Sequence, residues 1–206
     1  MVHQPMTVES RVLELDLRQK TVIPRTHAES LHRQFLSHVN DRDRRLAAEL
    51  HGGRGSALRQ FTISSLFGPQ TVGTSDLHLK PGRFMVRFTA LGPDAVSALD
   101  LIENAECWRI AESSFTRRRW RRNPSEHPWA FSMTEEEMLV TAIRQAAKQR
   151  DRIETRFWSP TAFSLPGKTF ASGAGHFPDP ALILGSLRRK FTALVFHPTR
   201  RISIMI

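Results

Sequence analysis

Two hydrophobic periodicities organise the first half of the chain. Over residues 13–17 leucine alternates with charged side chains, and this period of two indicates a half-buried strand. Leu31, Phe35 and Val39 recur instead at helical spacing, so they predict an amphipathic helix over residues 26–39. Thr26 and Glu29 fit the capping box that begins such a helix. The chain therefore opens with a strand followed by a helix.

The same patterns continue to about residue 116. Residues 41–51 predict a second helix ending at a glycine pair, and Pro93 opens a further helix over residues 92–103. The predicted strands of this region cover residues 60–68, 83–91 and 106–115. The resulting order over residues 10–116 is β-α-β-β-α-β, the ferredoxin-like arrangement. The predicted class is thus α+β, with an antiparallel sheet that carries helices on one face.

The second half predicts an incomplete repetition of this unit. Residues 132–149 have a helical pattern that begins at a capping box of Thr134 and Glu137. A strand over residues 152–158, a long loop, and a helix over residues 180–196 follow. We therefore expect a ferredoxin-like domain over residues 1–116, a basic linker and helix over 117–150, and a partial second ferredoxin-like domain over 151–206.

Charge adds a class of partner to this picture. Lys and Arg number 30 against 20 Asp and Glu, which gives a net charge of +10 and an isoelectric point near 11.2. This balance favours nucleic acid, an anionic membrane surface or an acidic protein. A single cysteine excludes an internal disulfide and a cysteine-rich zinc site. No apolar run reaches the ~20 residues of a membrane span, so a cytoplasmic protein without a membrane partner is expected.

One histidine precedes a glycine-rich, arginine-bearing stretch. His51 ends the predicted helix 41–51, and Arg54 and Arg59 follow it. A histidine beside arginines suits metal-free phosphodiester cleavage, which needs an acid or base and nearby cations. A histidine also caps helix ends in many proteins, and the residues alone favour that role. The histidines lack zinc-site spacing and no phosphate-binding glycine motif occurs, so neither a metal nor a cofactor is expected.

Two blocks of the sequence are similar to one known family. "ELHGGRGSALRQFTISSLFG" (residues 49–68) resembles the N-terminal signature of the CRISPR-associated endoribonucleases that process CRISPR repeat transcripts, the sixth CRISPR-associated protein family. "FWSPTAF" (157–163) and "FPDPALILGSLRRKF" (177–191) resemble later motifs of that family. The resemblance implies tandem ferredoxin-like domains. It also implies metal-independent cleavage, in which the RNA 2′-hydroxyl attacks the adjacent phosphate.

The resemblance assigns roles to particular residues. It carries the family's catalytic histidine onto His51, and a basic residue before the Phe-Thr strand onto Arg59. Some members use a tyrosine of the first helix, but this sequence contains none, which leaves His38 as a substitute. The family's C-terminal glycine-rich loop has no counterpart in this sequence, so the resemblance also implies a truncated or a diverged C-terminus. These departures keep a repeat-binding protein that does not cut as an alternative.

An arginine-rich run is the main candidate for contact with repeat RNA. In "RRRWRR" the arginines can fork onto phosphates, and the tryptophan can stack on an unpaired base. The alternative is a solvated loop whose tryptophan packs on the domain. The predicted RNA-binding residues are Arg54, Arg117, Arg118, Arg119, Trp120, Arg121, Arg122, Arg188, Arg189 and Lys190. Other subunits of an effector complex are an open second class of partner. A basic ferredoxin-like protein unrelated to CRISPR, such as a ribosome-associated factor, is the third interpretation.

Overall fold

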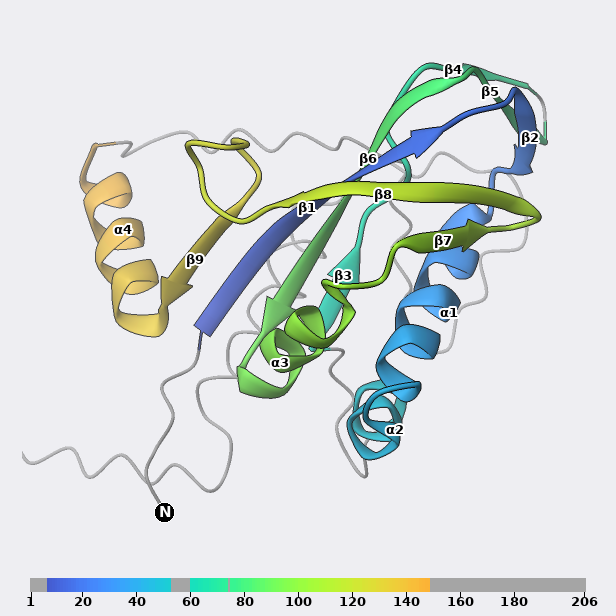
Figure 1. Ribbon diagram of the computed structural model, residues 1–206. Coiled ribbons are helices and arrows are strands. Elements are labelled where there is room, and N and C mark those ends of the chain that lie inside the picture. The colour runs from blue at the N-terminus through green and yellow to red at the C-terminus, as the bar shows by residue number, and fades with distance from the viewer. Residues whose placement is uncertain (1–6, 53–59, 74, 149–206) are drawn as a thin grey trace, which may run out of the picture. The chain divides into compact units, whose positions relative to one another are not determined.

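The computed structural model describes residues 7–52, 60–73 and 75–148 (Figure 1). By its internal contacts the chain divides into two units, Met1–Arg150 and Asp151–Ile206. The predicted second ferredoxin-like unit over residues 151–206 lies outside the described residues. The fold below is that of the first unit.

A large antiparallel sheet forms the centre of the first unit. Its strand order is β3-β6-β1-β8-β7, and β9 pairs with β1 beyond the end of β8. The strands are β1 (Thr7–Leu17), β3 (Phe61–Ile63), β6 (Gly82–Leu91), β7 (Cys107–Ile110), β8 (Ser113–Arg121) and β9 (Phe131–Thr134). Strands β8 and β9 follow the same edge of β1, and residues 122–130 leave that edge between them.

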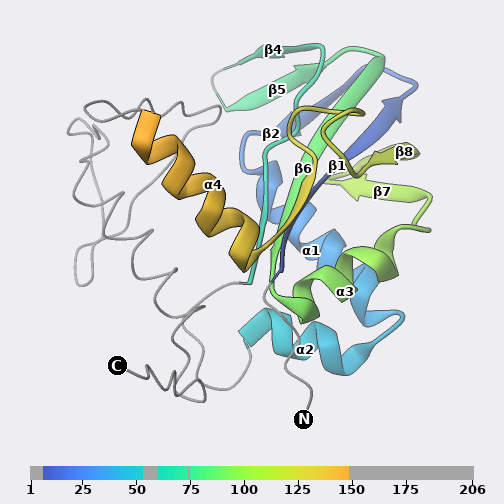
Figure 2. The same ribbon diagram turned by 90° about the vertical axis from the view of Figure 1, so that its left-hand side faces the viewer.

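Three helices cover one face of this sheet. They are α1 (His27–Asn40), α2 (Arg44–Gly52) and α3 (Pro93–Ile102), and Figure 2 shows them gathered as one layer, with α4 (Glu135–Lys148) set apart. The order β1, α1, β3, β6, α3, β8 matches the predicted β-α-β-β-α-β unit, and the spatial order β3-β6-β1-β8 is that of a ferredoxin-like sheet. The predicted fold class is confirmed for this unit.

The core lies between the sheet and the helix layer. Alternate residues of each strand point into it, and their periodicity is the reason the strands form where they do. The fully buried large side chains include Leu13, Leu15, Leu31, Phe35, Phe84, Phe88, Trp108 and Phe115. Aromatic rings dominate its centre, where Trp108 lies 6.4 Å from Trp120 and 5.5 Å from Phe88 between ring centroids.

Two predictions for the end of this unit are wrong. Residues 106–115 form a hairpin instead of one strand, because the chain turns between Ile110 and Ser113. Ala111 adopts a left-handed φ of 52° at this turn. Residues 117–121, predicted to begin a linker, continue β8 and pair with β1. The arginine-rich run therefore belongs to the ferredoxin-like sheet.

The sequence patterns missed a smaller sheet beside the main one. It pairs β2 (Thr21–Pro24), β5 (Asp76–Leu79) and β4 (Gln70–Val72), all too short for a clear periodicity. His27, which is 3% exposed, joins β2 to the chain after β3. Its Nε2 accepts a hydrogen bond from the Leu66 amide at 3.1 Å, and its Nδ1 lies 3.2 Å from the Pro24 carbonyl. The ring is thus the neutral Nδ1–H form, and burial lowers its pKa below the usual 6.5.

The helix starts agree only partly with the predicted caps. At α4, Thr134 Oγ1 accepts from the Glu137 amide and the Glu137 carboxylate accepts from the Thr134 amide, so this capping box is confirmed. At α1, Thr26 makes no side-chain cap and only its carbonyl accepts from the Glu29 amide, so the first box is wrong. None of the described helices has the length and apolar character needed to cross a bilayer.

Candidate nucleic-acid interface

The face of the main sheet opposite α1, α2 and α3, called the open face because none of these three helices covers it, is rich in arginine. Because Phe84, Val86 and Phe88 point into the core, the intervening residues of β6 point to this open face. The same alternation places residues of β7 and β8 there. The arginines of this open face are Arg83, Arg87, Arg109, Arg118, Arg119 and Arg121, and its strand carboxylates are Glu14 and Asp16. An excess of positive charge on one face favours a polyanionic partner.

A bulge in β8 decides which residues of the arginine run reach this face. Glu14 pairs with Arg119 and Leu15 pairs with Arg117, so Arg118 is an extra residue in the ladder. The extra residue shifts the alternation by one position. Arg119 and Arg121 consequently point to the open face, whereas Trp120 points to the core.

Trp120 is a core residue, which corrects the prediction that it stacks on RNA. Its ring lies 5.3 Å from that of Phe88, and its Nε1 donates to the Glu103 carbonyl at 3.2 Å. Only 9% of the residue is exposed. The alternative in which the tryptophan packs on the domain is the correct one, although it packs from a strand and not from a loop.

One buried carboxylate organises the arginines of β8. Glu14 is 5% exposed, and its two oxygens accept from Arg121 Nε at 2.9 Å and Arg119 Nε at 3.0 Å. Arg118 Nε lies 3.8 Å from the same carboxylate, and Arg118 Nη1 lies 3.5 Å from Asp16. Such a carboxylate is stable away from water because it is paired on both oxygens.

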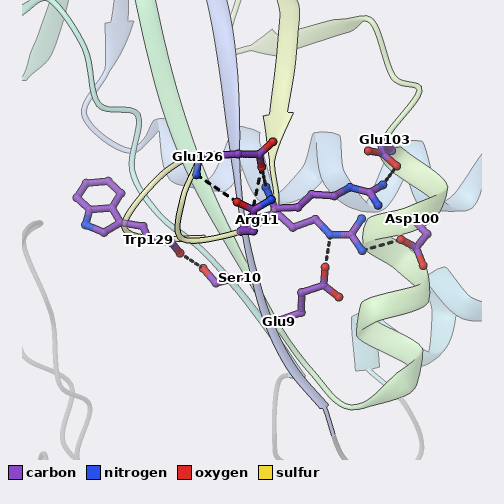
Figure 3. Close-up of polar contacts among 9 residues, drawn as sticks. Glu9, Ser10, Arg11, Asp100, Glu103, Glu126 and Trp129 are labelled. Carbon is purple, nitrogen blue, oxygen red and sulfur yellow. Dashed lines mark hydrogen bonds and ion pairs between the residues drawn. The ribbon is translucent and has the colours of Figure 1, made fainter. Parts of the chain in front are cut away.

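The remaining arginines of the run are placed differently. Arg122 forms an ion pair with Glu103 of the chain after α3, and its amide donates to Glu126 at 2.7 Å (Figure 3). That amide bond lowers the pKa of Glu126. Arg117 precedes the bulge, and its Nε is buried without a hydrogen-bond partner. The run is therefore neither a solvated loop nor one continuous basic surface.

Residues 122–130 cross part of the open face. Ser10 Oγ donates to the Trp129 carbonyl at 2.7 Å, and this hydrogen bond fixes the segment to β1 (Figure 3). The Trp129 ring lies 5.2 Å from that of Phe67 and 6.0 Å from the Arg87 guanidinium carbon. Trp129 was not among the predicted site residues, although its place beside the arginine run is visible in the sequence.

Two of the predicted catalytic residues, His51 and His38, lie in the helix layer. His51 is exposed in the last turn of α2, a helix that packs on α1 and α3. Arg54 and Arg59 lie outside the described residues, as do Arg188, Arg189 and Lys190. The structure thus places His51 on the helix side of the sheet and Arg119 on the opposite side.

His38 has a packing role in α1. Its ring meets the edge of Trp108 at 4.9 Å between centroids, and its Nε2 lies 3.1 Å from Gln34 Nε2. Burial lowers its pKa below the usual value. Within the described residues, no group of three or more His, Cys, Asp or Glu side chains is arranged to hold a metal ion.

Comparisons with solved structures identify the fold. The chain is similar to a Cas6 product complex at 24% identity and a TM-score of 0.60, covering 90% of this chain and 65% of that one. Cas6 from Thermus thermophilus is similar at 22% identity and a TM-score of 0.56, with 93% and 63% covered. The chain thus spans somewhat less than two thirds of the length of these structures. No protein-family model and no curated protein matches the sequence. The chain has the fold of the Cas6 proteins, as its resemblance to the CRISPR repeat-processing family predicted.

Proposed function

We propose that this protein is a metal-independent endoribonuclease that cleaves CRISPR repeat RNA to make guide RNAs. The observation that carries this proposal is the exposed position of His51 at the end of α2, in a chain with the Cas6 fold. A histidine acting on RNA must reach the substrate from the surface, and His51 is exposed. The sequence block around His51 is also the block that resembles the family's catalytic signature.

The proposed reaction is a transesterification within the RNA. The 2′-hydroxyl oxygen attacks the adjacent phosphorus and gives up its proton, while the bond from phosphorus to the 5′-oxygen breaks and that oxygen takes up a proton. The products are a 2′,3′-cyclic phosphate and a 5′-hydroxyl. His51 would hold or move one of these protons, and Arg59 would face the charge that develops on the phosphate.

The arginines of the open face would bind the RNA backbone away from the cleavage point. They lie on the side of the sheet opposite α2, so binding and cleavage would use different surfaces. Phosphate contacts of this kind supply affinity without reading sequence. After cleavage, these contacts would let the protein retain the repeat segment, for example within an effector complex.

A second candidate function is repeat-RNA binding without cleavage. The packing of His38 against Trp108 favours it, since His38 is only half-exposed in the described part of the chain, whereas His51 is exposed. A single histidine without a second proton-transfer group would give slow cleavage or none.

Cleavage of the cognate repeat RNA in EDTA tests the proposal. The assay compares the wild type with His51→Ala, and uses a 2′-deoxy substitution at the cut site as the chemical control. We expect both changes to abolish cutting, by at least about a hundredfold, while RNA affinity is kept. His78→Ala, which removes a histidine from the small sheet, is the matched control and should cut normally.

The outcomes separate the two candidates. Wild-type cutting in EDTA that disappears in His51→Ala supports the nuclease. Tight binding of the repeat without any cutting supports the binding protein. Cutting that survives in His51→Ala, or that depends on an added metal ion, would show that the assigned mechanism is wrong.

A further inference from the structure

The open face contains an acidic side chain where a surface for polyanions is expected to have none. Glu14 lies at the centre of the arginines of β8, on the strand that pairs with them. Simple charge counting says that this carboxylate opposes the binding of RNA. Its hydrogen bonds suggest the opposite effect.

Glu14 binds two guanidinium groups, and each of them donates to it through its Nε. Arg119 and Arg121 each donate through Nε, at 3.0 and 2.9 Å, to different oxygens of the carboxylate. A guanidinium has five N–H donors in a fixed plane, so a bond at Nε fixes the orientation of that plane and leaves the edge formed by the two terminal nitrogens unused. Among the described residues, the hydrogen bonds of Arg119 and Arg121 use Nε alone. The exposed fraction of the side chain is 47% for Arg119 and 18% for Arg121.

The ion pairs of Glu14 and Asp16 do not neutralise all the positive charge of the neighbouring arginines. Glu14 and Asp16 contact Arg118, Arg119 and Arg121, so this cluster retains one net positive charge. Both oxygens of Glu14 are engaged and nearly shielded from water, which fixes its position in the ladder of β1 and β8. An arginine held by such a fixed carboxylate has already lost much of its rotamer freedom. Binding a ligand then costs less side-chain entropy.

We infer that Glu14 is a positioning residue that aims Arg119 and Arg121 as forks for the phosphate groups of single-stranded RNA. The terminal nitrogens of a guanidinium match two phosphate oxygens, so a held guanidinium binds a phosphodiester with a smaller entropy cost. The ligand class is the sugar-phosphate backbone, without base specificity. This inference rests on the proposed function, because it assumes that RNA is the partner of the open face.

The experiment measures binding of a short oligouridylate, which needs neither the repeat sequence nor cleavage. In Glu14→Gln the neutral amide cannot hold two arginines through Nε. We expect affinity to fall about tenfold although a negative charge has been removed. The slope of log K against log salt should become shallower by about 0.7 for each phosphate that the variant no longer neutralises.

Two further variants control for charge and for folding. Asp16→Asn removes the same charge from a carboxylate of the same strand that is 40% exposed, and it should leave affinity unchanged or raise it about twofold. Arg119→Lys keeps the charge but removes the planar fork. If Glu14 acts through Arg119, the effect of Glu14→Gln should shrink in the Arg119→Lys background. Thermal unfolding of each variant confirms that the folded protein is compared.

Each outcome decides the inference. Weaker binding in folded Glu14→Gln, with the smaller effect in the Arg119→Lys background, supports it. Equal or tighter binding in Glu14→Gln overturns it, as does the same weakening in Asp16→Asn. A wild type that does not bind oligouridylate at moderate salt also overturns it. A wild type that binds but cuts no repeat RNA contradicts only the proposed nuclease.

Discussion

The two faces of the main sheet contain different kinds of large side chain. On the helix side, aromatic rings pack together, and Trp120 uses its single polar atom on a backbone carbonyl. On the open side, the arginines that flank Trp120 in β8 gather around one buried carboxylate. Trp120 therefore packs in the core, whereas its neighbours Arg119 and Arg121 pair with Glu14 and are the proposed contacts for RNA. A substitution in the core should leave RNA affinity largely unchanged.

The largest expected effect comes from the helix side. Trp120→Ala removes a buried ring and leaves a cavity beside Phe88 and Trp108, so the free energy of unfolding should fall by about 3–5 kcal/mol. Denaturant unfolding measures this, with Trp120→Phe as the control that keeps an aromatic ring but loses the Nε1 hydrogen bond and part of the ring volume, so its effect should be smaller. RNA affinity of the folded variant should stay within about twofold. Weaker RNA binding without a change in stability would contradict the core position of Trp120.

A smaller effect on stability is expected when the two arginines that pair with Glu14 are replaced. Arg119→Gln with Arg121→Gln leaves Glu14 buried without its two hydrogen-bond donors, which should destabilise the protein by about 2–3 kcal/mol. Adding Glu14→Gln removes the unpaired charge and should restore most of that stability, although RNA affinity stays low. Calorimetry of the double and triple variants, with RNA titrations alongside, measures both changes. If the triple variant is no more stable than the double, Glu14 is not a buried partner of these arginines.

Acid should lower the free energy of unfolding because the helix side contains a buried neutral histidine. The pKa of His27 is lowered by burial, so below its unfolded value of 6.5 the unfolded chain binds a proton that the folded chain does not. Stability is therefore complete above pH 6.5 and declines as the pH falls toward the folded pKa, by up to about 1.4 kcal/mol per pH unit from this residue. Melting temperatures across this range should show the decline, and His27→Gln should make it shallower. An unchanged slope in that variant would contradict the neutral tautomer.

The smallest effect concerns the turn that sets the register of β8. Ala111 has a left-handed φ of 52°, which glycine adopts without steric cost. Ala111→Gly should raise the free energy of unfolding by about 0.5 kcal/mol, since relief of this strain is partly offset by the greater entropy of glycine in the unfolded chain. Glu112→Gly, at the other turn residue, is the comparison and should not stabilise. A lower stability of Ala111→Gly would show that the turn carries no strain.

Periodicity predicted the helix side well. Leu13, Leu15 and Leu17 form the predicted buried row of β1, and Leu31, Phe35 and Val39 face the core from α1. These residues were predictable because burial on a single face imposes a regular spacing that a sequence displays directly. Pro93 at the start of α3 and the Thr134 cap of α4 follow the same logic of local chemistry.

The open face was harder to predict because it depends on pairing between distant residues. Phe115 and Trp120 are separated by an odd number of positions, so strict alternation puts them on opposite faces. The bulge at Arg118 brings both into one core. A bulge leaves no clear pattern in the sequence, and neither does the choice of Glu14 as the partner of Arg119 and Arg121. The sequence therefore drew attention to the arginine run, while the orientation of its side chains required the structure.

The pair of tryptophans in the core gives this protein an optical signature. Trp108 and Trp120 hold their rings 6.4 Å apart at an angle of 70°, and the chain contains no tyrosine to obscure them. Two indole chromophores so close and so skewed couple their electronic transitions, which gives a pair of circular-dichroism bands of opposite sign. This couplet exists only while β7 and β8 are joined in the hairpin. Its appearance during refolding therefore reports the packing of β7 against β8.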